Sequence, residues 1–514
     1  MKQFLLILVI VVLVPCVKNA NILTLLPLAG KSHHVMFERI VRGLANKGHQ
    51  VDFVNHFPLK NPPPGYNDMS LKGTLKIFVN NLTINEVQFK THLDTMDFML
   101  TAVGVKTCET LFQSDVLKNL RNTTKKYDLI ITEVFTVDCM IGFAHIFKVP
   151  VISLTTSVNL PWGSDRFGLP DNPSYIPNYF MDYSPKMTLY ERFWNTVYLI
   201  ISKLKHYNGN IEIYQASKDF FGEDLPSLND LIYNTTLLFV NSHFSSNQAR
   251  PTVPGFIEIG GVHINDPKPL DQHFQELLKT ELDGIIYLSM GSMIKTESFP
   301  IEKIQAMFDV FAELPYKVIW KADVDQFPKG VQFAKNIHFK KWMPQLDILC
   351  SSKVNLFVSH GGLMGSQEAV YCGVPRLGIP LFADQELNIR QAEKMGQAIK
   401  VDYNEISKQK ILNAAKELLY NQKYQQNAKK FSVLFKDRPM SALDTAIYWT
   451  EYVIRHKGAP HLKSQATELS WYQYFLLDVA LIFLSILFFT IYVLVMFAKL
   501  LLLLVGSKPK NKKD

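Results

Sequence analysis

The sequence predicts an α/β fold built from two doubly wound domains, whose parallel sheets face each other across a cleft. Apolar runs that suit buried strands alternate with stretches of helical periodicity, an order typical of parallel sheets with helices on both faces. The alternation breaks in segment 241–270, which is rich in Pro, Gly, Asn and Ser, and then resumes. A long uncharged run at 479–498 adds a membrane-spanning helix near the C-terminus.

In the first half, residues 21–30 form an apolar run that ends in glycine, which predicts a strand followed by a tight turn. Residues 35–44 repeat apolar side chains at close to 3.6 residues and therefore predict a helix. Further buried strands are expected at 50–57, 127–135 and 150–156.

The second half shows the same alternation. Its apolar runs predict strands within 284–292, 316–322, 337–345, 354–362 and 374–382. In doubly wound sheets, ligands bind beyond the carboxyl ends of the strands. We therefore expect the functional side chains of this chain directly after its strands.

These patterns divide the chain into six segments. Residues 441–458 have apolar side chains at helical spacing and are expected to pack the chain back against the first domain. The expected segments are a signal peptide (1–20), an N-terminal domain (21–250), a C-terminal domain (251–440), a return helix with a juxtamembrane segment (441–474), a transmembrane segment (475–505) and a basic cytoplasmic tail (506–514).

Both ends of the chain carry membrane signals. Residues 1–20 combine Lys2, an apolar run and the small Ala20, which predicts a secretory signal, with a retained anchor as the alternative. Positive residues follow the uncharged run and stay cytoplasmic, which predicts a type I protein with a lumenal body. Lys510 and Lys512 resemble the dilysine retrieval signal of endoplasmic reticulum membrane proteins, or they merely flank the span.

Charge, sequons and cysteines narrow the class of protein. The net charge is +8, but most of the excess of positive charge belongs to the two ends, which argues against nucleic-acid binding by the body. Three acceptor sequons, at Asn81, Asn122 and Asn234, fit a lumenal body. The cysteines that follow the signal have neither the spacing of a metal motif nor that of a dense disulfide framework: Cys108, Cys139, Cys350 and Cys372.

One strand-end cluster in the second half predicts a phosphate site. Ser292 follows a strand at a turn whose backbone N–H groups could hold a diphosphate, and His360 precedes a helix start with Gly361 and Gly362. Free N–H groups and the helix dipole stabilise an anion there by about 0.3–1 kcal/mol, or up to about 2 kcal/mol when the site is partly buried. Gly365 lies in the first turn of the same predicted helix.

Other side chains nearby suit a nucleotide and a sugar. Trp342 offers a flat face on which a heteroaromatic base can stack, and Gln345 offers an amide to the edge of that base. Glu368, about two turns into the helix, can accept two ribose hydroxyls. Asp384 and Gln385 follow a strand as an adjacent acceptor and amide, which suits vicinal sugar hydroxyls.

The motifs "WMPQLDIL" and "HGGLMGSQEAVYCGVPRLGIPLFADQELN" closely resemble the signature of the UDP-glycosyltransferases. The resemblance extends from "ILTLLP" to the membrane anchor and is closest to insect-type members in "ALDTAIYWTEYVIRHKGAPHL". It implies the GT-B fold, in which two Rossmann-like domains bind the acceptor (21–250) and the UDP-sugar (251–440). One departure is Met364, because many members have Asn four places after the histidine.

The resemblance also implies a reaction. A sugar passes with inversion from a UDP-sugar co-substrate to a small lipophilic acceptor, without a metal or another cofactor. The resemblance to insect-type members favours glucose, with glucuronate as the alternative. The implied donor contacts are uracil on Trp342, uridine on Gln345 and Glu368, diphosphate on Ser292 and His360, and sugar on Asp384 and Gln385. Such a protein is expected to act in detoxification at the endoplasmic reticulum membrane.

The acceptor side needs a base, and His33 matches the catalytic histidine of the family. A histidine with a pKa near 6.5 can take a proton from a hydroxyl at neutral pH. His34, the next residue, is expected to point away from the cleft. Two carboxylates are candidates for orienting His33. Glu133, which ends a strand, is favoured, and the alternative is Asp138, which opens the next helix and could instead cap it.

The sequence is compatible with two other interpretations of the function. The motif Asp323-x-Asp325 occurs in metal-dependent transferases, although it lies here in a polar loop without a histidine nearby. The alternative from a different class is a membrane-tethered protein that binds a small ligand or nucleotide without catalysis. The sequence also leaves open whether the chain forms a homo-oligomer.

Overall fold

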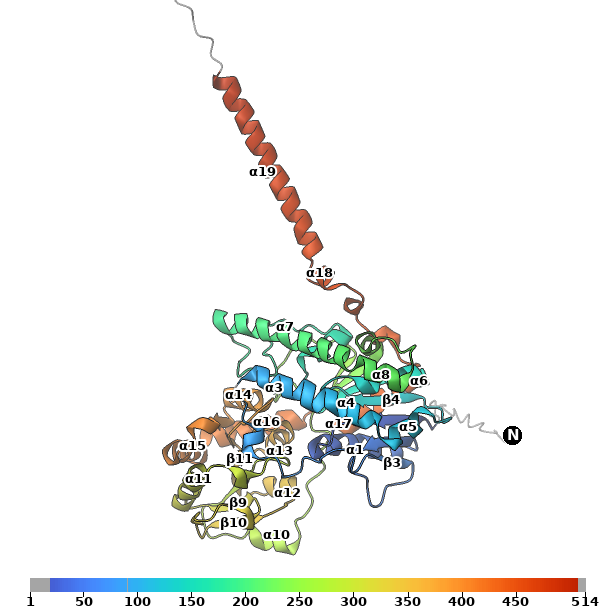
Figure 1. Cartoon of the computed structure of the whole chain (residues 1–514). Helices are drawn as coiled ribbons and strands as arrows, with labels where there is room; N and C mark the ends of the chain where they lie inside the picture. The colour runs from blue at the N-terminus through green and yellow to red at the C-terminus, as the bar shows by residue number, and fades with distance from the viewer. Residues whose placement is uncertain (1–18, 90, 507–514) are drawn as a thin grey trace, which may run out of the picture. The chain divides into compact units, whose positions relative to one another are not determined.

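The structure, a computed structural model, describes residues 19–89 and 91–506 (Figure 1). The expected signal peptide and the tail with Lys510 and Lys512 lie outside the described residues, apart from the ends of those two segments. The chain divides into two compact units, Met1–Lys463 and Ser464–Asp514.

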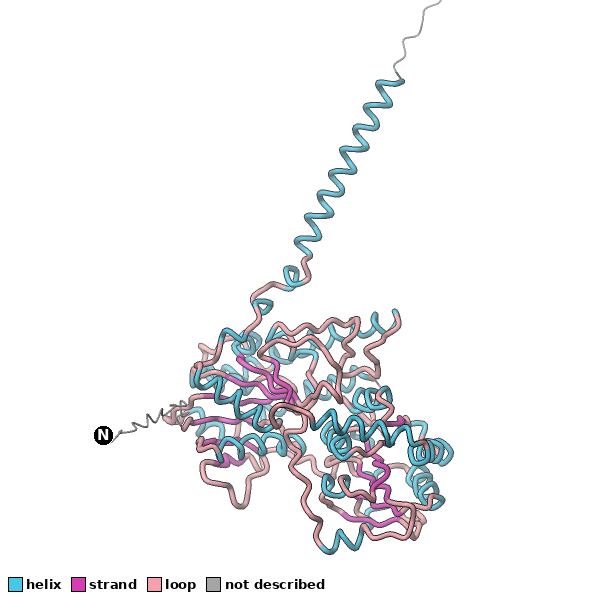
Figure 2. The backbone as a smooth tube through the Cα atoms, turned by 180° about the vertical axis from the view of Figure 1, so that it is seen from behind, coloured by secondary structure: helices cyan, strands magenta, loops and turns pink. Residues whose placement is uncertain are grey.

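The first unit contains two separate sheets, in which every strand pairing is parallel (Figure 2). The first sheet has seven strands in the order β3-β2-β1-β4-β5-β6-β7. They are β1 (Asn21–Leu25), β2 (Gln50–Asn55), β3 (Tyr66–Ser70), β4 (Leu129–Glu133), β5 (Val151–Thr155), β6 (Thr235–Val240) and β7 (Phe256–Glu258).

The second sheet has six strands in the order β10-β9-β8-β11-β12-β13. They are β8 (Ile285–Ser289), β9 (Lys317–Lys321), β10 (Ile337–Lys340), β11 (Val354–Ser359), β12 (Arg376–Gly378) and β13 (Ala398–Lys400). In both sheets the first strand in sequence lies beside the fourth, as in a Rossmann fold, so each sheet has a switch point where a ligand can bind.

Helices connect the strands of each sheet. Those of the first half are α1 (Lys31–Asn46), α2 (Ile84–Val87), α3 (His92–Asp97), the π-helix η1 (Phe98–Val105), α4 (Lys106–Phe112), α5 (Asp115–Arg121), η2 (Cys139–Ile141), α6 (Gly142–Phe147), η3 (Pro161–Gly163), η4 (Asp165–Phe167), α7 (Leu189–Glu212), α8 (Tyr214–Phe221), α9 (Leu228–Leu231) and η5 (Ile232–Asn234).

The helices of the second half lie between β7 and the end of the first unit. They are α10 (Gln272–Leu277), η6 (Thr296–Ser298), α11 (Ile301–Glu313), η7 (Val324–Gln326), α12 (Gln345–Leu349), α13 (Leu363–Cys372), α14 (Gln385–Lys394), η8 (Tyr403–Glu405), α15 (Lys408–Tyr420), α16 (Gln422–Lys436), α17 (Ala442–Arg455) and η9 (Pro460–Leu462).

The strands expected from apolar runs are present, because each run contributes buried side chains to one of the two parallel sheets. Strands β3, β6, β7 and β13 are additional to those expected. The first sheet continues through β7 (Phe256–Glu258), beyond the boundary expected at residue 250. The reason is that β7 lies inside the Pro- and Ser-rich stretch and pairs with β6, so the residues between these two strands form a crossover within the first sheet.

The two halves touch at their facing edges. Backbone N–H groups of Asn80 and Leu82 donate to the carbonyls of Ser292 and Met293, at 2.8 and 3.0 Å. Asp182 of the first half pairs with Arg390 and Lys400 of the second half. Apolar contacts join the halves as well, because Leu82, Ile84 and Val87 of the first half belong to the core cluster of the second half.

Helix α17 packs against α1, as its helical spacing predicts. Ala442, Ala446, Ile447 and Val453 join the core cluster that also contains α1 and the inner strands. A side chain at Gly43 of α1 would begin 2.8 Å from Leu443, so the two helices approach at a glycine. Helix α17 is therefore part of the core of the first domain.

The second unit contains η10 (Gln465–Thr467), α18 (Trp471–Tyr474) and α19 (Leu477–Gly506). Of the described helices, α19 is long and apolar enough to cross a membrane, and its 30 residues span about 45 Å. It includes the expected 479–498 run. Trp471 and Tyr474 precede it, which suits the interface of a bilayer.

Replacing Ile447 by alanine should destabilise the fold by about 2–5 kcal/mol, because the side chain is 5% exposed and its loss leaves a cavity between α17 and α1. Thermal unfolding of the full chain in detergent measures the effect. Tyr448→Ala is the control, because Tyr448 is 42% exposed on the same helix, and its melting temperature should change little. Equal losses in both variants would contradict this packing.

Candidate functional site

A cavity of about 1010 Å³ lies between the carboxyl ends of the two sheets. Its wall on one side comes from residues that follow β1 and β5, and on the other from residues that follow β8, β9, β10, β11 and β12. The expected residues that line it are His33, Ser292, Trp342, Gln345, His360, Gly362, Gly365, Glu368, Asp384 and Gln385. Each side chain reaches the cavity because parallel strands end at a common edge.

His33 lies in the first turn of α1, after β1 and Gly30. Its Nδ1 is 2.5 Å from Oε1 of Glu133, the last residue of β4, and 2.7 Å from the hydroxyl of Thr156. With the proton on Nδ1, the ring donates to the carboxylate and leaves the lone pair on Nε2. The His33 side chain is 15% exposed, whereas that of Glu133 is 1% exposed.

The imidazole of His33 is fixed from several directions. The hydroxyl of Thr156 also donates to Glu133 Oε1, at 3.1 Å. Phe135 packs edge-on against the ring at 4.7 Å, and a side chain at Gly30 would begin 3.1 Å from it. The ring therefore has a fixed position with one nitrogen free for chemistry.

The structure places Asp138 in a different environment. Its carboxylate pairs with Arg166 at 2.6 Å and with His206 at 2.8 Å, in a buried cluster that does not contain His33. Although burial raises the pKa of Asp138, Arg166 and His206 outweigh it and hold that pKa well below its usual range. Its side chain makes no cap hydrogen bond either. The alternative pairing of Asp138 with His33, and the cap, are both wrong.

His34 points away from the cavity, as expected. It is fully buried, stacks against Phe53 and lies 3.1 Å from Glu38 on the next turn of α1. Burial lowers the pKa of His34. Adjacent histidines thus have different environments because successive helix positions point in different directions.

The wall formed by the second sheet presents an exposed aromatic surface. Trp342, after β10, is 60% exposed, and the ammonium of Lys321 lies 4.6 Å from its ring centroid. Lys321 ends β9, and its Nζ donates to the carbonyl of Gly291 at 2.5 Å. Burial lowers the pKa of Lys321 to about 8. A cation and an aromatic face therefore lie together on this wall.

Gln345 and Glu368 contact each other across the start of α12 and the middle of α13. Gln345 Nε2 donates to Glu368 Oε2 at 2.5 Å, and His263 Nε2 lies 3.8 Å from the other carboxylate oxygen. Burial raises the pKa of Glu368 to about 7, and Asp347 adds to the rise, while Gln345 opposes it. Burial has the opposite effect on the histidine and lowers the pKa of His263 to about 4.

His360 packs closely against two glycines. A side chain at Gly291 would begin 2.5 Å from the ring, and one at Gly362 would do the same. Burial lowers the pKa of His360 to about 4, and the ammonium of Lys321 adds to that fall. The ring is therefore neutral at pH 7 and can act as a hydrogen-bond donor rather than as a cation.

The start of α13 has the geometry of an anion site. The helix begins at Leu363 after Gly362, which provides no side-chain cap, so its first N–H groups have no cap partner from that residue. Gly361 has φ of 84°, and a side chain there would collide with Ile389, so only glycine fits. Met364 packs against the core cluster of the first half. The side chain at this position faces the first half, where an asparagine would also point. Met364 packs against the first half and so connects the two halves.

Asp384 and Gln385 lie at the start of α14. Ala383, the residue before them, has a φ of 57°, a strained backbone conformation that sets the direction of the turn. The Oε1 of Gln385 accepts from the N–H groups of Leu381 and Phe382, which leaves its NH₂ to donate. Asp384 accepts from Asn388 at 2.9 Å; burial raises its pKa, and His33 is close enough to oppose that rise.

Three residues of this site did not emerge from the sequence patterns: Thr156, Lys321 and His263. Thr156 directly follows β5 and Lys321 ends β9, so the rule that located the other residues applies to both. His263 follows no strand end in the same way, and only tertiary contact with Glu368 identifies it.

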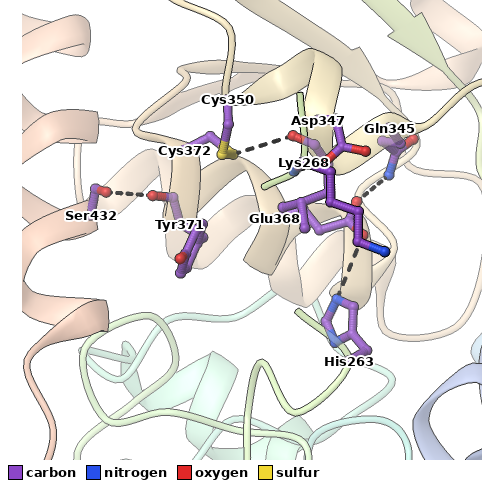
Figure 3. Close-up of a disulfide and its surroundings, with 10 residues drawn as sticks. His263, Lys268, Gln345, Asp347, Cys350, Glu368, Tyr371, Cys372 and Ser432 are labelled. Carbon is purple, nitrogen blue, oxygen red and sulfur yellow. Dashed lines mark hydrogen bonds and ion pairs between the residues drawn. A yellow bond between two sulfur atoms is a disulfide. The ribbon is translucent and has the colours of Figure 1, made fainter. Parts of the chain in front are cut away.

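Two disulfides join elements of the site. Cys350–Cys372 connects the residue after α12 to the last residue of α13, the helices that carry Gln345 and Glu368 (Figure 3). Cys108–Cys139 connects α4 to η2 in the first half. The cysteine spacing did not indicate these pairs, because each pair is brought together by the fold.

The Asp323-x-Asp325 motif lies outside the cavity lining. Asp323 pairs with Lys341 at 2.8 Å and accepts from the backbone of Asp325. Among residues 19–89 and 91–506, no group of three or more His, Cys, Asp or Glu side chains is arranged to hold a metal ion.

Replacing Glu368 by glutamine should stabilise the empty protein at pH 8. The unfolded carboxyl has a pKa near 4.5 and the folded one near 7, so ionising the buried group above pH 7 costs up to about 3 kcal/mol. The melting temperature of the variant should exceed that of the parent at pH 8 and approach it at pH 5. The exposed Glu417→Gln is the control, and an unchanged difference between the two pH values would contradict the burial cost.

Comparison with known proteins agrees with this geometry. The sequence profile described as UDP-glucoronosyl and UDP-glucosyl transferase matches residues 22–511. The UDP-glycosyltransferase UGT5 of Dactylopius coccus is 41% identical over 470 residues, 89% of this chain and 88% of that protein. UDP-glucosyltransferase 2 of the same organism is 40% identical over 471 residues, 91% and 90% of the two chains.

More distant relatives share the same family and fold. UDP-glucuronosyltransferase 2B15 of Homo sapiens is 32% identical over 395 residues, which cover 76% of this chain and 72% of that protein. The crystal structure of the glycotransferase of kitacinnamycin aligns with a TM-score of 0.55 and 16% identity, over 86% of this chain and 99% of that chain. The two parallel sheets are thus those of the GT-B fold, and this chain belongs to the UDP-glucoronosyl and UDP-glucosyl transferase family as a UDP-glycosyltransferase.

Proposed function

We propose that this enzyme transfers glucose with inversion from UDP-glucose to a hydroxyl of a small lipophilic acceptor, and that His33 is the general base. The contact between His33 Nδ1 and Glu133 carries the proposal, because it leaves Nε2 free at the cavity wall. Nε2 takes the proton as the acceptor oxygen bonds to the anomeric carbon. The bond from that carbon to the phosphate oxygen breaks, and UDP leaves with the bonding electrons.

The donor occupies the wall formed by the second sheet. Trp342 stacks on uracil, with Gln345 at the edge of the base, and ionised Glu368 accepts from the ribose hydroxyls. The diphosphate lies at the start of α13, near His360 and the turn at Ser292. Donors and dipoles fixed in advance at a developing charge usually make the largest electrostatic contribution to such a reaction.

The leaving diphosphate needs no metal in this proposal. Lys321 lines the cavity and is held close to Gly291, in the turn that carries Ser292. Its ammonium and the first N–H groups of α13 together supply positive potential where the charge develops. A bound diphosphate would also restore the charge that burial disfavours on Lys321.

Glucose suits the sugar site better than glucuronate. Asp384 and Gln385 offer an acceptor and an amide donor, which match neutral vicinal hydroxyls. Among the described residues that line the cavity none is arginine, the side chain that binds carboxylates in a bidentate manner. The relatives from Dactylopius coccus, one of them named a glucosyltransferase, are also more similar in sequence than the vertebrate glucuronosyltransferases.

The acceptor lies between His33 and the π-helix η1. Phe98, Met99, Ala102 and Val103 of η1 line this part of the cavity. A π-helix is rare and occurs mostly at functional sites. The apolar lining favours a lipophilic acceptor, and the spanning helix keeps the enzyme near compounds dissolved in lipid.

His33→Ala should lower the transfer rate by about 10²–10⁴-fold while UDP binding stays nearly unchanged, because the base contacts only the acceptor. Glu133→Gln should lower kcat at an unchanged melting temperature. Transfer to a panel of hydroxyl acceptors and isothermal titration with UDP measure these effects.

Asp138→Asn is the matched control for Glu133→Gln. It should lose about 3–5 kcal/mol of stability, because Arg166 stays buried without its partner, while the folded fraction keeps its rate. Full activity in His33→Ala would overturn the assignment of His33 as the general base. UDP binding without turnover by the unaltered enzyme across the panel would instead indicate a non-catalytic carrier.

Removing the disulfide Cys350–Cys372 with the double serine variant should raise the KM for UDP-glucose more than the KM for the acceptor, because α12 and α13 carry Gln345 and Glu368. Steady-state kinetics at a temperature where both forms are folded give the two constants. The control is the Cys108–Cys139 pair, which joins α4 next to η1, and its double serine variant should change mainly the acceptor KM. The opposite assignment would contradict the placement of the two substrates.

We also propose that the body is lumenal and the protein a type I protein of the endoplasmic reticulum membrane. Glycosylation tests this orientation, because only sequons in the lumen are modified. Asn122 and Asn234 are exposed, whereas the Nδ2 of Asn81 donates to the carbonyl of Ile77 beside the contact between the halves. Endoglycosidase should shift the mobility of the chain, and Asn122→Gln and Asn234→Gln should each reduce the shift. A chain without any shift would contradict the topology.

A further inference from the structure

In helix α7 the buried face is polar and the exposed face is apolar, which is the reverse of the usual arrangement for a surface helix of a water-soluble protein. Its buried residues are Asn195, Ser202, His206, Gly209 and Asn210. Its exposed large apolar residues, 36–76% exposed, are Leu189, Tyr190, Phe193, Trp194, Ile200, Leu204, Tyr207 and Ile211. A surface helix normally turns its apolar face to the core. Figure 1 shows α7 along the outer edge of its unit.

The exposed apolar residues form one continuous stripe. Leu189, Phe193, Ile200, Leu204 and Ile211 follow one another at intervals of four or seven residues, so they lie on one face of the helix. The 24 residues of α7 make this stripe about 36 Å long. A stripe of this length is much larger than the scattered apolar residues that a soluble surface tolerates.

The polar contacts of the inner face fix the helix in this orientation. Asn195 donates to the carbonyls of Pro173 and Ile176, and it accepts from the backbone of Asn178. Farther along the helix, His206 binds Asp138 at 2.8 Å. Turning α7 over would leave these buried groups without partners, so the outward stripe is a property of the folded protein.

We propose that α7 lies in the interface of the membrane that α19 spans, with its apolar stripe among the acyl chains. The stripe is rich in Leu, Ile, Phe, Trp and Tyr, and Lys186 and Lys205 lie beside it, a composition typical of interfacial helices. The bilayer is the partner because the chain carries its own spanning helix. The 21 residues from His456 to Leu476 extend at most about 75 Å, so the body cannot leave the membrane.

Docking of α7 would bring the acceptor site close to the lipid. Helix α7 packs against η1, and η1 lines the acceptor part of the cavity. On the proposed function, a lipophilic acceptor then needs to travel only a short path from the bilayer to His33. The location of α7 itself can be measured without any assay of transfer.

The test places a fluorophore on the stripe of the full chain. Ile200→Cys, labelled with a nitrobenzoxadiazole, is reconstituted at one copy per phosphatidylcholine nanodisc, with and without doxyl-labelled lipid. The expected result is a blue-shifted emission that the doxyl lipid strongly quenches. The control is Lys416→Cys on the exposed face of α15, which should show neither effect, and the labelled parent chain gives the background.

Two further measurements separate the outcomes. Adding Phe193→Glu and Leu204→Glu to the labelled chain should abolish the quenching while the melting temperature stays within a few degrees of the parent. Absence of quenching in the labelled Ile200→Cys chain in single-copy discs would overturn the proposal. Energy transfer between labels in two-copy discs, together with that absence, would show that a second copy of the chain covers the stripe instead.

Discussion

The contact between His33 Nδ1 and Glu133 Oε1 couples the fold to the chemistry. The carboxylate ends β4 and the imidazole follows β1, and these two strands are neighbours at the switch point of the first sheet. Moving β4 by one residue would turn Glu133 to the other face of the sheet. The free nitrogen of the ring therefore has a fixed place at the wall of the cavity, opposite the helix starts of the second sheet.

The second sheet repeats the same arrangement for a different purpose. Its switch point lies between β8 and β11, and the turns after these strands bring Gly291 and His360 into contact. Burial there lowers the pKa of Lys321 to about 8 and raises that of Glu368 to about 7. Both shifts mean that, without a ligand, the charged forms of Lys321 and Glu368 lower the stability of the fold. On the proposed function, bound UDP would give both groups partners, so a site that lowers the stability of the protein alone would favour the ligand.

Strand ends were predictable from sequence because a parallel sheet gathers them at one edge. Apolar runs located β1, β4, β8 and β11, and the residues at or beyond the ends of these strands led to His33, Glu133, Ser292 and His360. The sequence favoured Glu133 over Asp138 as the partner of His33. It could not show that Arg166 and His206, distant in sequence, hold Asp138. The disulfide pairs and the strand β7 depended on tertiary contacts in the same way. The outward direction of the apolar face of α7 likewise follows from the fold.

The central claim is a single displacement in which His33 activates the acceptor, and the configuration of the product tests it most directly. UDP-glucose is an α-glycoside at the anomeric carbon, so direct attack by the acceptor inverts that carbon. Proton NMR of the product formed in the first turnovers reads the configuration from the coupling constant of the anomeric proton. The account predicts the β-glucoside alone. The α-glucoside would contradict it, because retention requires a second displacement or attack from the face of the leaving group.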